Sequence, residues 1–266
     1  MTIAEFIDTY LAHLVAVIAL VQVWALAAWK RWIVKGRIEF HPAANIEVGF
    51  SSFGSTVALP GTLRAVKKEV FVSDMGVTIT RLQDQAKHTF TWRAFRSNTF
   101  SAASMAPEAI DLATSFNLLP TSPRPINVVY ASAEFASRYA QQAEQLRAAW
   151  QLFVAGKMAE LGDQAASLVN TAGFVDALFG EFSHEQAALD LYTQISNGFY
   201  WQAGRYKLDL GINCASPTNS MHYTWFFELT QDDEQKLRLN ALVMMKEICS
   251  IQVIYNFIYK PYASAT

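Results

Sequence analysis

A long uncharged stretch opens the pattern of hydrophobic and polar positions along the chain. Thr9–Trp29 contains no charged residue, and it is bounded by Asp8 and Lys30. As a helix it would be roughly 31 Å long, which matches the thickness of about 30 Å of a bilayer core. The pattern therefore predicts that residues 1–36 form a single transmembrane α-helix with a basic juxtamembrane segment.

The flanks of this stretch predict how it lies in the membrane. Trp24, Trp29 and Trp32 gather toward its C-terminal end, where indole rings favour the lipid headgroups. Lys30 and Arg31 follow, whereas no lysine or arginine precedes the stretch. These five residues are the predicted membrane-interface anchors. Because basic residues stay preferentially on the cytoplasmic side, we expect the N-terminus outside and the main domain in the cytoplasm.

Two alternatives concern the same stretch. Ala25-Leu26-Ala27 resembles a signal-peptide cleavage site, but the region before the apolar stretch is acidic, which argues against cleavage. Two polar residues lie inside the stretch and offer a second alternative, a functional role within the membrane. His13 lies near enough to the interface to reach it, whereas Gln22 lies deeper and could hydrogen-bond to a partner helix.

From Ile38 onward the pattern changes to short segments of alternating polar and apolar residues. Ile46, Val48 and Phe50 alternate with polar or small residues, and 88–92 repeats that alternation. The segment 73–76 has the composition of a turn between two strands. Several short strands at this spacing are typical of an all-β sandwich or a barrel.

Helical periodicity replaces this alternation between Ser132 and Asn197. Apolar residues recur there at spacings of three, four or seven, which is typical of the buried face of a helix. Ser183 and Gln186 have the spacing of a capping box, which predicts a helix start at Ser183. We expect these helices, at about 132–197, to be an insertion, because each set of strands alone would leave exposed edges. A separate helical domain is the alternative.

Strands and one further helix are predicted after this insertion. The segments 206–212 and 223–229 alternate with period two. Thr230 and Asp233 form a second capping signature, which predicts a helix over about 231–248. Residues 251–259 have strand character, and we expect them to pack against the domain.

Together these patterns predict a single N-terminal transmembrane α-helix followed by an α+β soluble domain over 37–266. The domain is predicted to be an antiparallel β-sandwich with a helical insertion. It resembles the immunoglobulin fold in general appearance, with Trp92 as the central tryptophan. The two flanking cysteines of antibody domains are missing from the sequence, and a resemblance at the level of the fold implies no activity.

Composition indicates a large apolar core and argues against nucleic acid as a partner. Hydrophobic residues make up 52% of the 266 residues, charged residues make up 17%, and the formal net charge is −2. A nucleic-acid-binding protein normally carries a basic excess. Cys214 and Cys249 are too few for a disulfide framework, so we expect two reduced, buried thiols.

The sequence carries none of the usual motifs of a catalytic, cofactor or metal site. It has no Gly-x-x-x-x-Gly-Lys-Ser/Thr loop, no Gly-x-Gly-x-x-Gly motif and no Gly-x-Ser-x-Gly elbow. The histidines are not spaced as metal ligands, although His222 could meet Cys214 across a hairpin turn. We therefore predict no cofactor, no metal ion and no catalytic residue.

Dense aromatic residues remain as a candidate binding surface. Phe199, Tyr200, Trp201 and Trp225 could form a partner-binding face, although aromatic core packing explains the same pattern. We expect a membrane-tethered protein-interaction or accessory protein with a protein partner. One alternative is an enzyme whose site lies at the helical insertion, and the other is a carrier or sensor of an apolar ligand. The enzyme alternative predicts a pocket that includes one or more of the histidines, namely His88, His184 and His222.

Overall fold

The structure, a computed structural model, describes residues 3–29, 36–43, 45–96, 110–162, 173–216 and 218–263. Its helices are α1 (Ile3–Ala28), α2 (Ala133–Leu161), α4 (Phe174–Phe182), α5 (Gln186–Asn197) and α6 (Gln231–Ile248). The first strands are β1 (Arg37–Pro42), β2 (Asn45–Ser51), β3 (Gly54–Val66), β4 (Val70–Arg81), β5 (Lys87–Arg96) and β6 (Ile110–Leu112). The remaining strands are β7 (Phe116–Leu118), β8 (Arg124–Ala131), β9 (Gly204–Ser216), β10 (Thr218–Leu229) and β11 (Ile258–Pro261).

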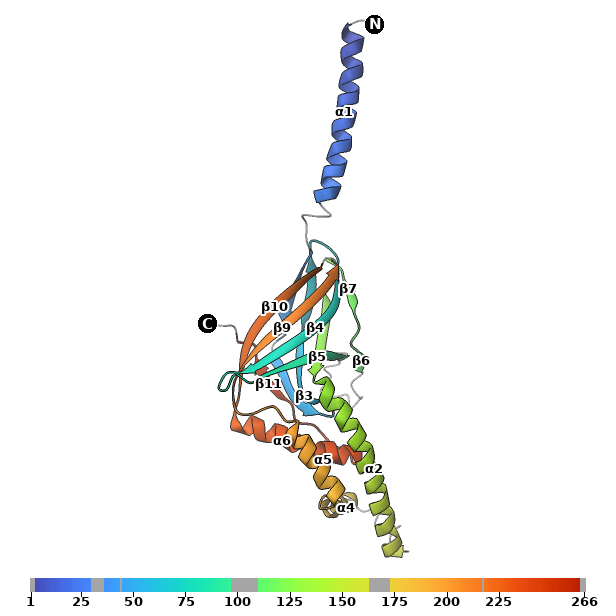
Figure 1. The fold of residues 1–266 in the computed structure, drawn as a ribbon, viewed down its shortest axis with the longest axis vertical. Coiled ribbons are helices and arrows are strands. Elements are labelled where there is room, and N and C mark those ends of the chain that lie inside the picture. The colour runs from blue at the N-terminus through green and yellow to red at the C-terminus, as the bar shows by residue number, and fades with distance from the viewer. Residues whose placement is uncertain are drawn as a thin grey trace.

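One curled antiparallel sheet forms the body of the molecule (Figure 1). Its strands follow the order β10-β9-β4-β5-β8-β3-β2-β11, while β1, β6 and β7 pair along β3, β5 and β4. The prediction of an immunoglobulin-like β-sandwich is therefore wrong, because a single half-barrel sheet encloses the core. The physical reason is strand length: β3, β4, β9 and β10 are 12 or 13 residues long, and twist accumulates along such strands into a curl.

The two edges of this sheet come together at one point. The main-chain N–H of Phe226 in β10 donates to the carbonyl of Ala263 at 2.8 Å, and the N–H of Ala263 donates back at 3.2 Å. Ala263 follows β11, which pairs with β2 at the other end of the strand order. The residues after β11 thus link the first strand of the order to the last.

Aromatic side chains fill the inside of the curl. Trp201, Tyr130, Tyr206 and Phe90 are each almost fully buried there. Trp92, which the immunoglobulin comparison predicts as a central tryptophan, is only partly buried on β5, where it packs against Phe95 and Phe116. The tryptophan at the centre of the core is therefore Trp201 and not the Trp92 that the immunoglobulin comparison predicts.

The strands on either side of the helices, which are predicted to share one sandwich, belong to one sheet instead. β4 pairs with β9 over Phe71–Arg81, although the helices separate the two strands in the sequence. The predicted turn at 73–76 lies inside β4, where the register with β9 shifts between Val72 and Asp74. A β-bulge accounts for the glycine and the polar residues of that segment, because a bulge also interrupts regular pairing.

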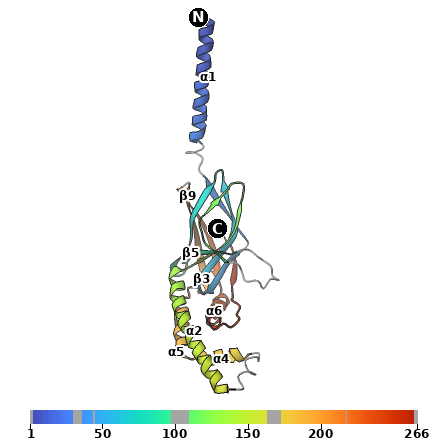
Figure 2. The ribbon, with the colours of Figure 1, turned by 90° about the vertical axis from the view of Figure 1, so that its right-hand side faces the viewer.

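The helices α2, α4 and α5 lie between β8 and β9 and extend from one end of the sheet (Figures 1 and 2). They pack together with α6 and with Phe50 of β2 in a second apolar cluster. The predicted capping box at Ser183 is wrong, because α5 begins at Gln186 and the Ser183 hydroxyl donates to the Gly180 carbonyl instead.

The helix α6 confirms the prediction made from its capping signature. It spans Gln231–Ile248, and the side chains and main-chain N–H groups of Thr230 and Asp233 bond reciprocally at its start. The segment after α6 is a strand only over β11, so most of the predicted strand at 251–259 is irregular. Asn240 of α6 holds that segment through hydrogen bonds to Asn256.

The N-terminal helix α1 stands away from the sheet (Figures 1 and 2). Among the described residues, no helix is long and apolar enough to cross a membrane. The predicted transmembrane anchor and its single-pass topology are therefore wrong.

The predicted interface anchors lose their support with the span. Trp24 on α1 and Trp29 directly after it are exposed, whereas Lys30, Arg31 and Trp32 lie outside the described residues. The location of the main domain in the cytoplasm depended on the same segment, and it stays an untested prediction.

Candidate functional site

A cleft opens where the β4–β5 hairpin, the start of α2 and the segment between α5 and β9 meet. Its volume is about 400 Å³. The wall from the hairpin contains Arg81 and His88, the wall from α2 contains Phe135 and Arg138, and Tyr200 lies on the third side. The cleft therefore combines residues from three parts of the chain that are far apart in the sequence.

An ion pair holds the turn at the hairpin wall. Nε of Arg81 donates to Oδ1 of Asp84 at 2.9 Å, and the same oxygen accepts the main-chain N–H of Ala86 at 3.2 Å. The hydrogen bond from Arg81 is the main reason that the pKa of the Asp84 carboxyl falls to about 2. The bond to Asp84 likewise raises the pKa of the Arg81 guanidinium above its ordinary value. Both groups are therefore charged at any physiological pH.

Tyr200 and His88 meet at the base of the cleft. Their ring centroids are 3.8 Å apart, and the rings are tilted by 47°. The Tyr200 hydroxyl donates to the carbonyl of Ala86 at 3.3 Å, and its main-chain N–H donates to the Ser55 hydroxyl at 3.0 Å. Burial, with a smaller contribution from the positive charge of Arg81, lowers the pKa of His88. The imidazole is therefore neutral at pH 7.

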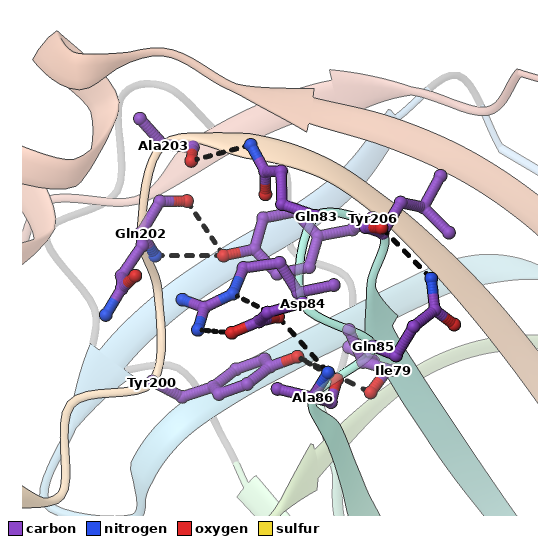
Figure 3. Close-up of polar contacts among 11 residues, drawn as sticks. Ile79, Gln83, Asp84, Gln85, Ala86, Tyr200, Gln202, Ala203 and Tyr206 are labelled. Atoms are coloured by element: carbon purple, nitrogen blue, oxygen red, sulfur yellow. Dashed lines mark hydrogen bonds and ion pairs between the residues drawn. The ribbon is translucent and has the colours of Figure 1, made fainter.

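A polar network fixes the segment between α5 and β9 beside this base (Figure 3). The Tyr206 hydroxyl accepts the Gln202 N–H at 2.9 Å and donates to the Gln202 carbonyl at 2.8 Å. The Gln83 amide donates to the carbonyl of Ala203, and the Ala203 N–H donates to Glu234 of α6. Figure 3 shows that the bond between Gln83 and Ala203 joins the β4–β5 turn to the residue before β9.

Gly198 allows α5 to approach α2 at the mouth of the cleft. A Cβ atom at this position would lie 2.2 Å from the ring of Phe135, so a larger residue would displace that ring. Phe135 in turn packs against Phe50 of β2 and stacks on Tyr139 of α2. The packing of Phe135 at the mouth of the cleft therefore requires glycine at position 198.

The cleft continues as a groove between α2 and α5. A hollow of about 370 Å³ shares Phe135, Arg138, Asn197 and Gly198 with the cleft. A second hollow of about 410 Å³ shares three lining residues with the first one, namely Gln142, Leu191 and Gln194. We call this continuous run, from the cleft through both hollows, the α2–α5 groove.

Side-chain amides dominate the polar part of the α2–α5 groove. Gln142, Gln194 and Asn197 line it, and Oε1 of Gln142 is buried without a hydrogen-bond partner. Arg138 lies where the cleft joins the first hollow, and its guanidinium is 3.9 Å from the exposed Glu134 carboxylate. A surface ion pair at this distance contributes little free energy, so Arg138 can exchange this partner at small cost.

Of the four aromatic residues that the sequence singles out, Tyr200, Trp201 and Trp225 are part of the core, and only Tyr200 among these three also lines the cleft. Trp201 is fully buried and donates to the carbonyl of Gly49 at 2.8 Å, and Trp225 packs against Phe40 and Tyr262. These two tryptophans present no surface to a partner. The other two, Phe199 and Tyr200, line the cleft.

The three histidines of the enzyme alternative do not converge. His88 lies in the cleft, His184 lies in the turn between α4 and α5, and His222 lies on β10. Cys214 pairs with Asn219 in the β9–β10 hairpin and is buried on the inner side, whereas His222 is exposed and contacts the Ser220 hydroxyl. The Cys214 thiol and the His222 imidazole therefore do not meet. Burial raises the pKa of the Cys214 thiol, which disfavours the reactive thiolate.

Both cysteines are free and buried, as the composition predicts. Burial raises the pKa of the Cys249 thiol to about 12. Within the described parts of the chain, no three His, Cys, Asp or Glu side chains are grouped so that they could hold a metal ion. The site thus offers hydrogen-bonding and charged groups rather than an activated nucleophile.

Comparisons with known proteins add no further information about the site. No protein-family model matches the chain, and no curated protein matches it. The residues that sequence reasoning missed are Arg138, Gln142 and Gln194. Their only signal in the sequence is the number of glutamines on the helices of the insertion, and that signal does not indicate which faces meet.

Proposed function

We propose that this protein is a non-enzymatic interaction module that binds an extended segment of a partner protein in the α2–α5 groove. The observation that carries the proposal is the continuity of the cleft with two further hollows along the same pair of helices. A continuous run of this kind suits an elongated ligand better than a compact one.

The chemistry of the groove supports a peptide as the ligand. Each side-chain amide offers two N–H donors and one carbonyl acceptor, which match the C=O and N–H groups of a peptide main chain. The Oε1 of Gln142 is buried without a partner, so it can accept such an N–H once its side chain turns into the groove. Arg138 offers a planar guanidinium that binds carboxylates in a bidentate manner. We therefore expect the bound segment to carry an aspartate or glutamate near the cleft.

Two observations favour binding over the alternatives. The His88 ring packs on Tyr200, and the other two histidines of the enzyme alternative lie on different elements. The inside of the sheet is filled by large side chains such as Trp201 and Tyr130, which occupy the space that an apolar ligand would need. The groove between the helices therefore provides the better site.

A displayed library of unstructured peptides, selected on the purified chain, tests the proposal. Selected peptides should contain an acidic residue, and hydrogen–deuterium exchange should show their protection on α2 and α5. The substitution Arg138→Glu should weaken binding at least about tenfold, since the loss of a charged contact of about 1.4 kcal/mol has that effect.

Arg147→Glu is the matched control. Arg147 lies on the same helix and pairs with Glu144 outside the groove, so its reversal should change affinity less than about twofold. Equal losses in both variants, or protection confined to other elements, would contradict the proposal.

A further inference from the structure

The two edges of the curled sheet face each other along a seam, and the described residues close only part of this seam by main-chain pairing. At the closed part, Phe226 of β10 and Ala263 exchange two main-chain hydrogen bonds. At the other part, β10 faces β1, which joins the sheet only through β3 among the described strands. We call this second part the β1–β10 seam.

Side chains replace a strand in the β1–β10 seam. The Tyr223 hydroxyl of β10 accepts the N–H of Phe40 at 3.1 Å and donates to the carbonyl of Ile38 at 2.9 Å. The N–H of Ile38 lies 3.0 Å from the sulfur of Met221. A thioether is a weak acceptor, so this N–H of β1 is hydrogen-bonded less strongly than it would be by the carbonyl of a neighbouring strand.

The opposite side of the seam carries a row of main-chain groups. Along a regular antiparallel strand, alternate residues direct their N–H and C=O groups to the same edge. Phe226 directs its groups toward Ala263, so Thr224, His222 and Ser220 direct theirs into the seam. Among the described residues, this edge of β10 is bridged only at Phe226.

The directions of the strands fit one further antiparallel strand. β11 runs antiparallel to β2, and Ala263 pairs with β10 in the antiparallel sense. β1 and β2 run in the same direction, because both pair antiparallel with β3. A strand placed in line with β11 would therefore run antiparallel to both β1 and β10. A hollow of about 420 Å³ lies over this position, between Ile38 and His222.

We propose that the β1–β10 seam is an acceptor site for an extended strand of a partner protein. The inserted strand continues the line of β11 and pairs with β1 on one side and β10 on the other. Main-chain hydrogen bonds supply the affinity, as in other cases of strand addition to a sheet edge. The Tyr223 hydroxyl acts as a latch that gives up its two bonds when the strand enters.

The surroundings of the seam define the chemistry of the partner segment. Phe40 and Trp225 lie on the core side, whereas His222 and Thr224 face solvent. Arg37 and Glu39, at the β1 side, pair with each other and leave no net charge there. The segment is therefore uncharged, with apolar residues at alternate positions on one face. This site is separate from the α2–α5 groove.

A pair of variants at one position isolates the main-chain contribution. His222→Pro removes the N–H that points into the seam, while His222→Ala removes the side chain and keeps that N–H. The probe is a set of decapeptides from a displayed random library, selected on the wild-type chain. Their binding is measured with an excess of the acidic peptide that was selected for the α2–α5 groove. The proline variant should lose at least about tenfold in affinity, and the alanine variant less than about threefold.

A second variant keeps the test valid if the proline variant does not fold. Tyr223→Phe removes the latch and should bind the same peptides about two- to tenfold more tightly, because no hydrogen bonds must be broken first. Arg138→Glu should leave this binding unchanged, which separates a failure here from a failure of the proposed function.

Amide exchange decides which molecule occupies the seam. Bound peptide should slow exchange at Ile38, Phe40, His222 and Thr224. The proposal is overturned if the amides of His222 and Thr224 are already protected from exchange in the free chain. That result would mean that the chain's own C-terminal residues fill the seam. It is equally overturned if protection appears only with rising protein concentration, which would make a second copy the occupant, or if peptides protect other elements alone.

Discussion

The hydroxyl of Tyr206 binds both main-chain groups of Gln202, four residues earlier in the chain. Tyr206 itself is fully buried in the core, so this contact anchors the segment before β9 to the inside of the sheet. That segment also contributes Tyr200 to the cleft. The position of one cleft wall therefore depends on a hydroxyl in the core.

Tyr206→Phe should lower the free energy of unfolding by about 1 kcal/mol. The ring is kept, and the two hydrogen bonds are lost, while the freed groups of the exposed Gln202 can still reach water. Urea denaturation followed by circular dichroism measures the change. Tyr192→Phe, at an exposed position of α5, is the control and should have no measurable effect.

His88 should make the fold less stable below about pH 6.5. Its pKa is lowered in the folded chain, first by burial and then by Arg81, whereas the unfolded chain takes up the proton near pH 6.5. Below that value the unfolded state binds more protons, so stability falls as the pH drops toward the folded pKa. Denaturation midpoints at several pH values should show this slope in the wild type and a smaller slope in His88→Gln. Identical slopes would disprove the assignment.

Asn240 should be one of the most sensitive polar positions. It is fully buried; Nδ2 donates to the carbonyls of Phe50 and Asn256, and Oδ1 accepts the Asn256 N–H. Asn240→Leu has a similar size but leaves these groups unpaired, at a cost of at least about 2 kcal/mol. Hydrogen exchange should also accelerate over 251–257. Asn117→Leu, on the exposed side of β7, should show neither change.

Thr230→Ala should lower stability by about 1 kcal/mol through the loss of the helix cap. For a chain of this size that change corresponds to a decrease of about 2–4 °C in the melting temperature. Differential scanning calorimetry is the measurement. Thr193→Ala in α5 is a matched control, because its hydroxyl bonds within the helix and alanine has the higher helix propensity. A decrease of the same size in both variants would rule out a capping role.

Local signals in the sequence predicted the elements whose causes are local. Thr230 and Asp233 fixed the start of α6, since a capping box depends only on residues three positions apart. The period of two likewise identified strand segments such as 206–212 within β9. Ser183 shows the limit of such a signal, because the same spacing occurs there without a cap.

The shape of the sheet and the groove could not be predicted in the same way. Pairing of β4 with β9 and the bond between Phe226 and Ala263 join residues that are distant in the sequence. Whether strands form one curled sheet or two stacked ones depends on these contacts, and periodicity does not contain them. Gln142 and Gln194 line the same hollow only because α2 and α5 pack together, so their shared groove is a property of the tertiary structure.

The pairing of β4 with β9 has a consequence for synthesis on the ribosome. When β4 emerges it can pair with β5 and β7, but its other neighbour follows only after the whole helical insertion has been made. During that interval a long strand edge stays open and can pair with strands of other nascent chains. Chains cut short before Gly204 should therefore aggregate, and productive folding should benefit from chaperones that hold the half-made sheet apart from its neighbours.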